Sequence, residues 1–252
     1  MIMGILNLTP DSFSDGGEHF SKKSALEHVY HLIDSGADII DIGGESTRPG
    51  SSNISEEEEL ERILGTVKEL APTVSIPISI DTSKPRVAEL SLKAGASMIN
   101  DVGGLRDVRM IDTVISYDAP AVIVHMHGTP KTFKTDMMEG DALSEIKKFL
   151  SERAEYAVSR GVKERNLIVD PGIGFGKTAG QDMEIIKNSG WFSDRYPILI
   201  GPSRKRFLSQ HYHGMDRDDA TAAASKLAVE SGATILRVHD VSKVVSALAR
   251  AD

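Results

Sequence analysis

Three short polar side chains occupy positions where they could recognise a flat, nitrogen-rich ligand. Asp81, Asn100 and Asp170 each end a short apolar run of the chain. Carboxylate and amide oxygens accept hydrogen bonds, and one aspartate can accept two of them from the edge of an amino-pyrimidinone ring. If these residues converge, they would bind a heterocycle that carries several N–H donors.

A second set of side chains could bind an anion, and it comprises Arg48, Lys205, Arg237 and His239. Such a cationic cluster suits a phosphate or pyrophosphate group, although the formal net charge of the whole chain is −8. The two sets together predict a ligand with a heterocycle at one end and a phosphate at the other.

Each of these residues also has an ordinary structural explanation. Asp81, Asp101 and Asp170 could cap the helices that follow them, and for Asp101 we favour that role. A single arginine or lysine is more often a solvated surface charge. Met126 and Phe175 belong to types found more often in the core than in contact with a ligand. Only convergence on one surface favours the functional interpretation.

The apolar runs indicate which elements carry these side chains. Eight runs alternate with longer amphipathic stretches and are bounded by turn residues, which is typical of buried parallel strands. They span residues 2–6, 38–42, 76–80, 97–100, 121–124, 167–170, 197–200 and 234–238. This pattern favours an α/β fold, a (β/α)8 TIM barrel of eight parallel strands with outer helices, formed by residues 1–252 as a single domain. Active sites of such barrels lie at the carboxyl ends of the strands, where the polar residues occur, so the pattern predicts an enzyme.

Several helix ends can be predicted from local signals. Ser55 with Glu58 matches a capping box, Ser24 with Glu27 matches it less well, and Asp141 could cap a helix that buries Ile146, Phe149, Leu150 and Ala154. The segments SGADII, AGASMI and SGATIL repeat one helix-to-strand junction. Their glycines, Gly36, Gly95 and Gly232, suit the left-handed position that follows a helix.

Composition excludes several classes of protein. The acidic balance disfavours binding to nucleic acid or to an anionic membrane. The chain has no cysteine, which excludes disulfides and thiolate metal sites. It contains no run of ~20 apolar residues that could span a membrane, and its first residues do not resemble a signal sequence. We therefore expect a cytoplasmic protein.

Two motifs suggest other functions. The run GIGFGKT at 172–178 resembles a nucleotide-binding loop, but Pro171 stands where the first glycine of a phosphate-binding loop is required. The pairs His125/His127 and His211/His213 could bind a metal in a barrel hydrolase, although no further ligand set is evident at the strand ends. We therefore consider a histidine-bound catalytic metal the weaker hypothesis.

The chain resembles the dihydropteroate synthases, a family of pterin-binding enzymes, along almost its whole length and in the family's order. The two signatures that carry the resemblance are MGILNLTPDSFSDGG at 3–17 and GGESTRPGS at 43–51. Further matching segments are SIDTSKP at 79–85, INDVGG at 99–104, HMHGTPKTF at 125–133, DPGIGFGK at 170–177, SRK at 203–205 and RVHDV at 237–241.

This resemblance implies a fold, a reaction and partners. The fold is a (β/α)8 barrel, and the reaction joins 6-hydroxymethyl-7,8-dihydropterin pyrophosphate to 4-aminobenzoate, releasing pyrophosphate and forming 7,8-dihydropteroate for folate biosynthesis. It also implies Mg²⁺ as the cofactor, with Asn7 at the metal site, and a homodimer. The C–O bond to pyrophosphate would break first, and the arylamine would then attack a pterin-stabilised carbocation.

The resemblance also implies a role for each matching residue. The implied pterin-binding residues are Asp81, Asn100, Met126, Asp170, Phe175 and Lys205. The implied pyrophosphate- and aminobenzoate-binding residues are Asn7, Phe13, Thr47, Arg48, Pro49, Arg237 and His239. The implied catalytic residues are Asp15, Asp81, Lys205, Arg237 and His239. Asp11 falls with Phe13 and Asp15 in a first loop that would close over the aminobenzoate.

Departures from the family pattern leave alternative functions open. Arg206 stands where many members have serine, which affects the aminobenzoate pocket and allows a substituted arylamine as the acceptor. A methyltransferase acting between methyltetrahydrofolate and a corrinoid protein would share the barrel and the pterin residues. It would not need ESTRPG, SRK or RVHD. A non-catalytic pterin-binding barrel would have lost phosphate-binding groups, whereas Asn7, Arg48, Lys205, Arg237 and His239 are all present.

Overall fold

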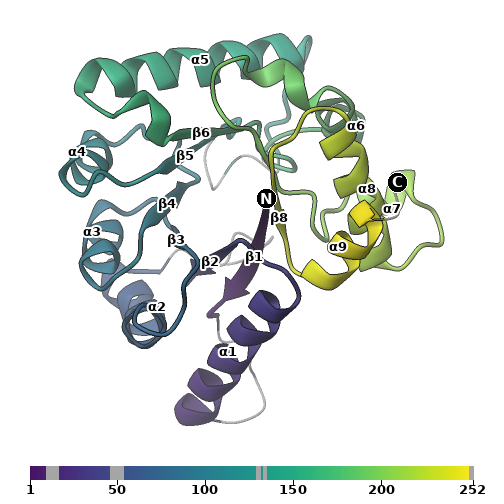
Figure 1. Ribbon diagram of the computed structural model, residues 1–252. Coiled ribbons are helices and arrows are strands. Elements are labelled where there is room, and N and C mark those ends of the chain that lie inside the picture. The colour runs from purple at the N-terminus through teal and green to yellow at the C-terminus, as the bar shows by residue number, and fades with distance from the viewer. Residues whose placement is uncertain (10–16, 46–53, 129–131, 133–134, 250–252) are drawn as a thin grey trace.

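Eight parallel strands form the centre of the molecule, and helices surround them (Figure 1). The computed structural model describes residues 1–9, 17–45, 54–128, 132 and 135–249. The strands are β1 (Ile2–Asn7), β2 (Ile39–Gly43), β3 (Ile78–Asp81), β4 (Met98–Asp101), β5 (Ala121–Val124), β6 (Leu167–Asp170), β7 (Leu199–Ile200) and β8 (Ile235–Val238). Each lies within two residues of a predicted apolar run at its start and within one at its end, so the predicted (β/α)8 barrel is confirmed.

The strand order along the sheet is β6-β5-β4-β3-β2-β1-β8-β7. At its two ends, β6 and β7 are joined by an isolated parallel bridge between Val169 and Ile198. The N–H of Val169 donates there to the carbonyl of Pro197 over 3.0 Å. This junction carries fewer backbone contacts than the neighbouring strand pairs, because β7 is only two residues long.

Helices cover the outside of the barrel (Figure 1). In chain order they are α1 (Gly17–Asp34), α2 (Glu56–Leu70), α3 (Pro85–Lys93), α4 (Val108–Ser116), α5 (Ala142–Arg160), α6 (Ala179–Lys187), α7 (Leu208–His211), α8 (Arg217–Glu230) and α9 (Val241–Ala249), with the short 3₁₀ helices η2 (Glu164–Asn166) and η3 (Ser189–Phe192). Within the described residues, none of these helices has the length and apolar character needed to cross a membrane.

Alternating residues of the strands face two separate cores. Ile40 and Ile42 of β2 belong to the large core between the barrel and the helices. Ile39 faces inward and packs in a smaller core with seven other buried side chains, which are Met3, Met98, Val122, Val124, Ile168, Leu199 and Ile235. This inner core fills the barrel below the strand ends, so the polar residues above it lie at an open mouth.

The structure confirms some of the predicted helix ends and corrects others. Ser55 caps α2 by accepting the N–H of Glu58, but the carboxylate of Glu58 contacts Arg62 rather than completing a capping box. Asp141 caps α5 as predicted. The Ser24 prediction was wrong, because Ser24 lies in the interior of α1. Instead, a capping box that we did not predict forms at α6 between Thr178 and Gln181.

Glycines and aspartates fix the loops around the barrel. Gly36, Gly95 and Gly232 have φ angles of 101°, 111° and 104°, which confirms the predicted left-handed junctions. Asp101, predicted to cap a helix, instead accepts the N–H groups of Gly103 and Leu105 in a turn, while Asp107 caps α4.

Candidate active site

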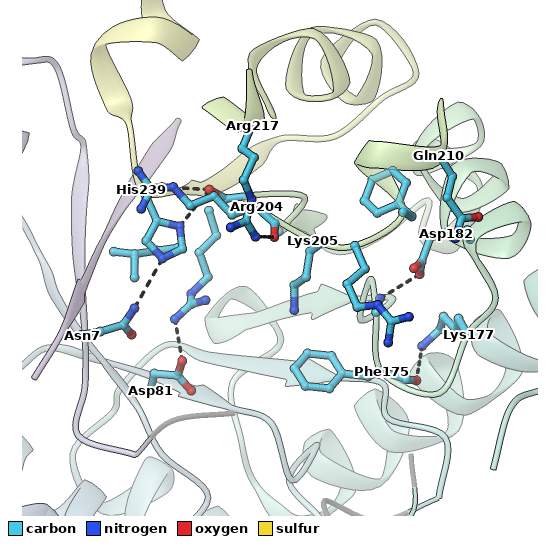
Figure 2. A pocket seen from close by; sticks show the side chains of 18 of the residues that line it. Asn7, Asp81, Phe175, Lys177, Asp182, Arg204, Lys205, Gln210, Arg217 and His239 are labelled. Carbon is cyan, nitrogen blue, oxygen red and sulfur yellow. Dashed lines mark hydrogen bonds and ion pairs between the residues drawn. The ribbon is translucent and has the colours of Figure 1, made fainter. Parts of the chain in front are cut away.

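The mouth of the barrel contains a cavity of about 650 Å³ at the carboxyl ends of the strands. Its walls carry Asn7, Asp81, Phe175, Lys205, Arg237 and His239. In Figure 2, Asn7 and Asp81 lie on one side of this space and Phe175 on the other, with Lys205 extending between them. A narrow extension of about 40 Å³ shares Asp81, Phe175, Lys205 and Arg237 with this cavity. It adds Asn100 and Asp170 to the lining.

Three side chains with hydrogen-bond acceptors, Asp81, Asn100 and Asp170, line the extension together with the cations of Lys205 and Arg237. The side-chain N–H of Asn100 donates to Oδ2 of Asp41 over 3.1 Å. Oδ1 of Asn100 is buried without a partner among the described residues. Oδ1 of Asp170 accepts the backbone N–H of Gly172 over 2.7 Å. Asp81 lines the same space. A ligand that fits here must therefore present N–H groups to these oxygens.

Burial perturbs the ionisation of the groups that line this space. It raises the pKa of Asp81 to about 7, with Arg237 opposing the shift and Asp41 adding to it. Burial likewise raises the pKa of Asp170 to about 6, against the Gly172 N–H and Lys205. Burial, with the charge of Arg237, lowers the pKa of Lys205. A ligand that donates hydrogen bonds to these carboxylates would favour their ionised forms.

Arg237 connects two carboxylates inside the barrel. Its Nε lies 2.6 Å from Oδ2 of Asp41, and its Nη2 lies 2.5 Å from Oδ2 of Asp81. Although burial lowers it, the two carboxylates raise the pKa of Arg237 above its ordinary value. A guanidinium has five N–H donors. The remaining donors can bind an anion in the cavity that Arg237 lines.

The ring of His239 is held from two sides. Nδ1 lies 2.8 Å from Oγ of the buried Ser203, which also accepts the backbone N–H of His239 over 3.1 Å. Nε2 lies 3.4 Å from Nδ2 of Asn7. Because Nδ2 of Asn7 faces the histidine, the Oδ1 of Asn7 is turned away from it. This geometry fixes the histidine and the asparagine together at one wall of the cavity (Figure 2).

Lys205 and Phe175 define the opposite wall. The ammonium group of Lys205 lies 4.5 Å from the centroid of the Phe175 ring, within the range of a cation–π contact. Phe175 belongs to the glycine-rich loop 171–178. That loop surrounds a buried lysine, because Nζ of Lys177 donates to the carbonyls of Gly172 over 2.8 Å and of Phe175 over 3.0 Å. The loop thus directs two carbonyl groups at its own lysine, whereas a phosphate-binding loop directs backbone N–H groups and its lysine at the phosphate.

Most of the predicted site residues that the structure describes converge on these two cavities. They are Asn7, Asp81, Asn100, Asp170, Phe175, Lys205, Arg237 and His239. Met126 is buried but lines neither cavity. Six further predicted residues lie outside the described part of the chain, and they are Asp11, Phe13, Asp15, Thr47, Arg48 and Pro49.

The geometry gives little support to the alternative hypothesis of a histidine-bound catalytic metal. His125 is buried with Nδ1 3.0 Å from Nζ of Lys177, and burial and the lysine lower its pKa to about 2. His127 lies 3.3 Å from Asp136. Among residues 1–9, 17–45, 54–128, 132 and 135–249, no group of three or more His, Asp or Glu side chains is arranged to hold a metal ion.

Sequence reasoning missed Asp41. This side chain is fully buried in the middle of β2 and contacts both Asn100 and Arg237. A signal was present, since the segment DIIDI places a charged residue inside an otherwise apolar strand. A charge that is buried in this way is rare unless it is paired.

The fold and the site define a class. This is a barrel enzyme with two adjoining binding regions at its mouth. The narrow extension, with the acceptors of Asp81, Asn100 and Asp170, forms a recess, and the side chains of Lys205, Arg237 and His239 form a cationic rim beside it. The family model described as "Pterin binding enzyme" matches residues 3–239. The dihydropteroate synthase of Bacillus subtilis is 42% identical over 248 residues, which cover 97% of this chain and 85% of that protein. The chain therefore belongs to the pterin-binding enzymes and, among them, to the dihydropteroate synthase family.

Other relatives and solved structures agree with this assignment. The Escherichia coli K12 dihydropteroate synthase is 38% identical over 250 residues, covering 98% of this chain and 89% of that protein. The Xanthomonas albilineans enzyme with 4-aminobenzoic acid has a TM-score of 0.91 at 39% identity, covering 99% and 90% of the two chains. The Burkholderia cenocepacia enzyme complexed with 7,8-dihydropteroate has a TM-score of 0.89 at 38% identity, covering 99% and 89%.

Proposed function

We propose that this chain is a dihydropteroate synthase, which condenses 6-hydroxymethyl-7,8-dihydropterin pyrophosphate with 4-aminobenzoate to give 7,8-dihydropteroate and pyrophosphate. The observation that carries the proposal is the acceptor-lined recess beside a cationic rim. The recess suits the N–H groups of a pterin, and the rim suits the pyrophosphate attached to it. The relatives in the comparisons carry the same name.

The pterin would occupy the recess. Asp170 and Oδ1 of Asn100 would accept its N–H groups, and Asp81 would lie on the side of the ring where positive charge develops. Lys205 and Phe175 would enclose it from the other wall, where they already contact each other. Met126 remains a predicted pterin contact, although it lines neither cavity.

The pyrophosphate would be bound at the rim by Arg237 and His239. Arg237 retains N–H donors beyond its two carboxylate contacts, and Ser203 holds the ring of His239. Hydrogen bonds and positive charge directed at the leaving group would stabilise the negative charge that develops as the C–O bond breaks. Both residues come from β8 and its end, so a rigid strand positions them.

We propose Mg²⁺ as the divalent ion that accompanies the pyrophosphate, with Asn7 as its protein ligand. The donor chemistry fits such an ion, because the amide oxygen of Asn7 is turned away from His239 at the wall of the cavity. Magnesium often binds through few protein oxygens together with phosphate oxygens and water. When bound, it would neutralise charge on the leaving pyrophosphate.

The reaction would then proceed in two steps. The C–O bond between the pterin methylene and the pyrophosphate breaks, and the electron pair leaves with the pyrophosphate. Asp81 would stabilise the resulting pterin cation, together with Asp15 of the first loop. The amine nitrogen of 4-aminobenzoate attacks the methylene carbon, and the proton that it loses passes to the released pyrophosphate or to water. No protein nucleophile is needed.

The two loop segments would supply the acceptor site. We propose that Asp11, Phe13 and Asp15 of the first loop close over the aminobenzoate, and that Thr47, Arg48 and Pro49 of the second loop help to bind the pyrophosphate and aminobenzoate. These residues lie outside the described part of the chain, so this assignment depends on the resemblance to the family. Exclusion of water matters here, because water would otherwise capture the cation.

The test is pyrophosphate release by the purified protein, supplied with the dihydropterin pyrophosphate and Mg²⁺, with and without 4-aminobenzoate. We expect release that depends on aminobenzoate and matches the dihydropteroate formed. Pterin binding without product would contradict the proposal. A substituted arylamine that restores turnover would then identify the acceptor, and methyl transfer from methyltetrahydrofolate to a corrinoid protein would identify the alternative enzyme.

Three organisational features stay proposals, and two of them have simple tests. We propose a single domain over residues 1–252, a homodimer and a cytoplasmic location. Sedimentation velocity would measure the oligomeric state, and one cooperative unfolding transition would support a single domain.

A further inference from the structure

We propose that Asp41 is a positioning residue that orients two ligand-binding side chains, the amide of Asn100 and the guanidinium of Arg237. This inference rests on the proposed function and goes beyond it, because Asp41 touches no substrate. It is fully buried and lines neither cavity.

The position of Asp41 in the barrel explains why its side chain contacts residues on distant strands. Its strand, β2, pairs with β1 and β3. The side chain nevertheless contacts Asn100 of β4 and Arg237 of β8, which are not neighbours of β2. A side chain can reach across the barrel in this way only if it points into the interior. Asp41 therefore lies directly between the inner apolar core and the ligand recess.

The contact with Asn100 sets the direction of an amide. A carboxylate only accepts hydrogen bonds, so the amide nitrogen of Asn100 must face Asp41. The nitrogen lies 3.1 Å from Oδ2 of Asp41, and Oδ1 of Asn100 is left buried without a partner among the described residues. Because Asn100 lines the recess, this oxygen is available to a ligand N–H. Without Asp41, the amide could rotate and present a donor instead.

The contact with Arg237 provides an anchor that no ligand can displace. Arg237 also contacts Asp81, but Asp81 lines both cavities and would be engaged by the pterin. Asp41 is out of reach of a ligand and lies 2.6 Å from Nε of Arg237. The guanidinium can therefore change its contact with Asp81 during turnover while it stays attached through Asp41.

Both contacts are made to one oxygen of Asp41, so a substitution there acts on both, and the choice of substitution separates the effect of charge from that of hydrogen bonding. Oδ2 accepts from both Asn100 and Arg237, whereas Oδ1 has no partner among the described residues. Asp41→Asn can keep an oxygen at the shared position and lose only the charge. Asp41→Leu removes the acceptor as well. Asn100→Asp carries an oxygen in both positions of the former amide, so it needs nothing to orient it.

The experiment measures pterin affinity by calorimetry with 6-hydroxymethyl-7,8-dihydropterin, and kcat with the pyrophosphate substrate, in the full-length protein. Asp41→Leu should weaken pterin binding and lower kcat, each by about tenfold or more. Asp41→Asn should keep pterin affinity within about threefold while kcat falls. In Asp41→Leu/Asn100→Asp, pterin affinity should recover and kcat should stay low.

A matched control is Ser79→Ala, because Ser79 is the register partner of Asp41 on β3 and is equally buried, with an unpaired hydroxyl among the described residues. It should leave both quantities unchanged. Asp41→Leu with wild-type affinity and kcat and only a lower melting temperature would show a structural role and overturn the proposal. Failure of Asn100→Asp to restore affinity would overturn the amide argument.

A wild-type measurement covers the case in which the variants do not fold. In a crystal structure with bound pterin, the contacts of Asp41 with Asn100 and Arg237 should persist. A bound state in which Arg237 has left Asp41, or in which the amide nitrogen of Asn100 faces the ligand, would refute the inference. Wild-type protein that neither binds pterin nor forms product would instead refute the proposed function.

Discussion

Arg237 and Asp81 form an ion pair across the mouth of the barrel, with Nη2 of the arginine 2.5 Å from Oδ2 of the aspartate. The two residues come from β8 and β3, which are separated by β1 and β2 in the sheet. A ligand that engages Asp81 from the recess must share this carboxylate with Arg237. The pair therefore couples the heterocycle end of the site to its anion-binding rim.

Removal of Arg237 should affect turnover more than pterin binding. Arg237→Ala loses a donor to the leaving group but leaves Asp81 free for the pterin, so kcat should fall about 100-fold or more, as for other groups that stabilise developing charge. The affinity for pterin lacking pyrophosphate should change much less. Steady-state kinetics and calorimetry check this, with Arg86→Ala on the α2–α3 surface as the control. Equal losses in kcat and affinity would contradict the leaving-group role.

Removal of the Asp170 carboxylate should weaken pterin binding directly. Asp170→Ala takes away a buried charged acceptor, and we expect a loss of ~2 kcal/mol or more in binding free energy. Asp170→Asn preserves volume and can still accept the N–H of Gly172, so it separates ligand binding from the local turn. Calorimetric titration measures both variants. Unchanged affinity in Asp170→Ala would contradict the assignment of the recess.

The two glycines Gly172 and Gly140 form a matched pair for testing the loop beside Asp170. Their φ angles are 71° and 70°, but a Cβ at Gly172 would lie 1.9 Å from the carbonyl oxygen of His125, whereas a Cβ at Gly140 meets nothing within 4 Å. Gly140→Ala should cost only the backbone strain of about 1–2 kcal/mol. Gly172→Ala should cost clearly more and also weaken pterin binding. Similar unfolding free energies for the two variants would show that the loop can move aside.

Lys177 should give the folded protein a distinct pH dependence. Burial lowers the pKa of its ammonium group to about 7. From about that pH up to the ordinary lysine value of about 10.4, the unfolded chain binds more protons than the folded one, so stability rises with pH. Relative to Lys177→Met, the wild-type free energy of unfolding should therefore increase from pH 7 to 9.5, by at most ~1.4 kcal/mol per pH unit. Urea titrations of both proteins measure the difference, and a flat difference would contradict the lowered pKa.

Removal of divalent metal should separate binding from catalysis. With Asn7 as the proposed protein ligand, the ion would be held largely by the pyrophosphate, so chelation should abolish turnover and leave the affinity for pterin lacking pyrophosphate unchanged. Activity assays and calorimetry with and without chelator test this. Full turnover in the presence of chelator would contradict the proposed Mg²⁺ requirement.

The barrel was predictable because apolar periodicity and turn residues act locally. Each strand of four or more residues falls within two residues of a predicted run at its start, whereas β7 is only two residues long although a longer run was predicted at 197–200. Ser24 failed as a helix start because α1 already begins at Gly17. A serine followed three residues later by a glutamate also occurs within helices, so this local match alone does not locate a helix end.

The candidate site was predictable where residues follow a strand, and unpredictable where they lie within one. Asp81, Asn100 and Asp170 converge because parallel strands end at the same edge. Asp41 lies inside β2, and its importance depends on partners 59 and 196 residues away in sequence. Its capacity to orient Asn100 follows from the barrel's curvature, which no local pattern encodes.

The junction between β6 and β7 gives substrate binding a second consequence. Asp170 ends β6, and Lys205 follows β7, so the two flank the part of the wall where the isolated bridge of Val169 and Ile198 joins the strands. A pterin bound by both residues would connect β6 to β7 across this junction. Ligand binding and closure of the barrel at this junction would then be coupled, and the bound state would resist local opening between β6 and β7.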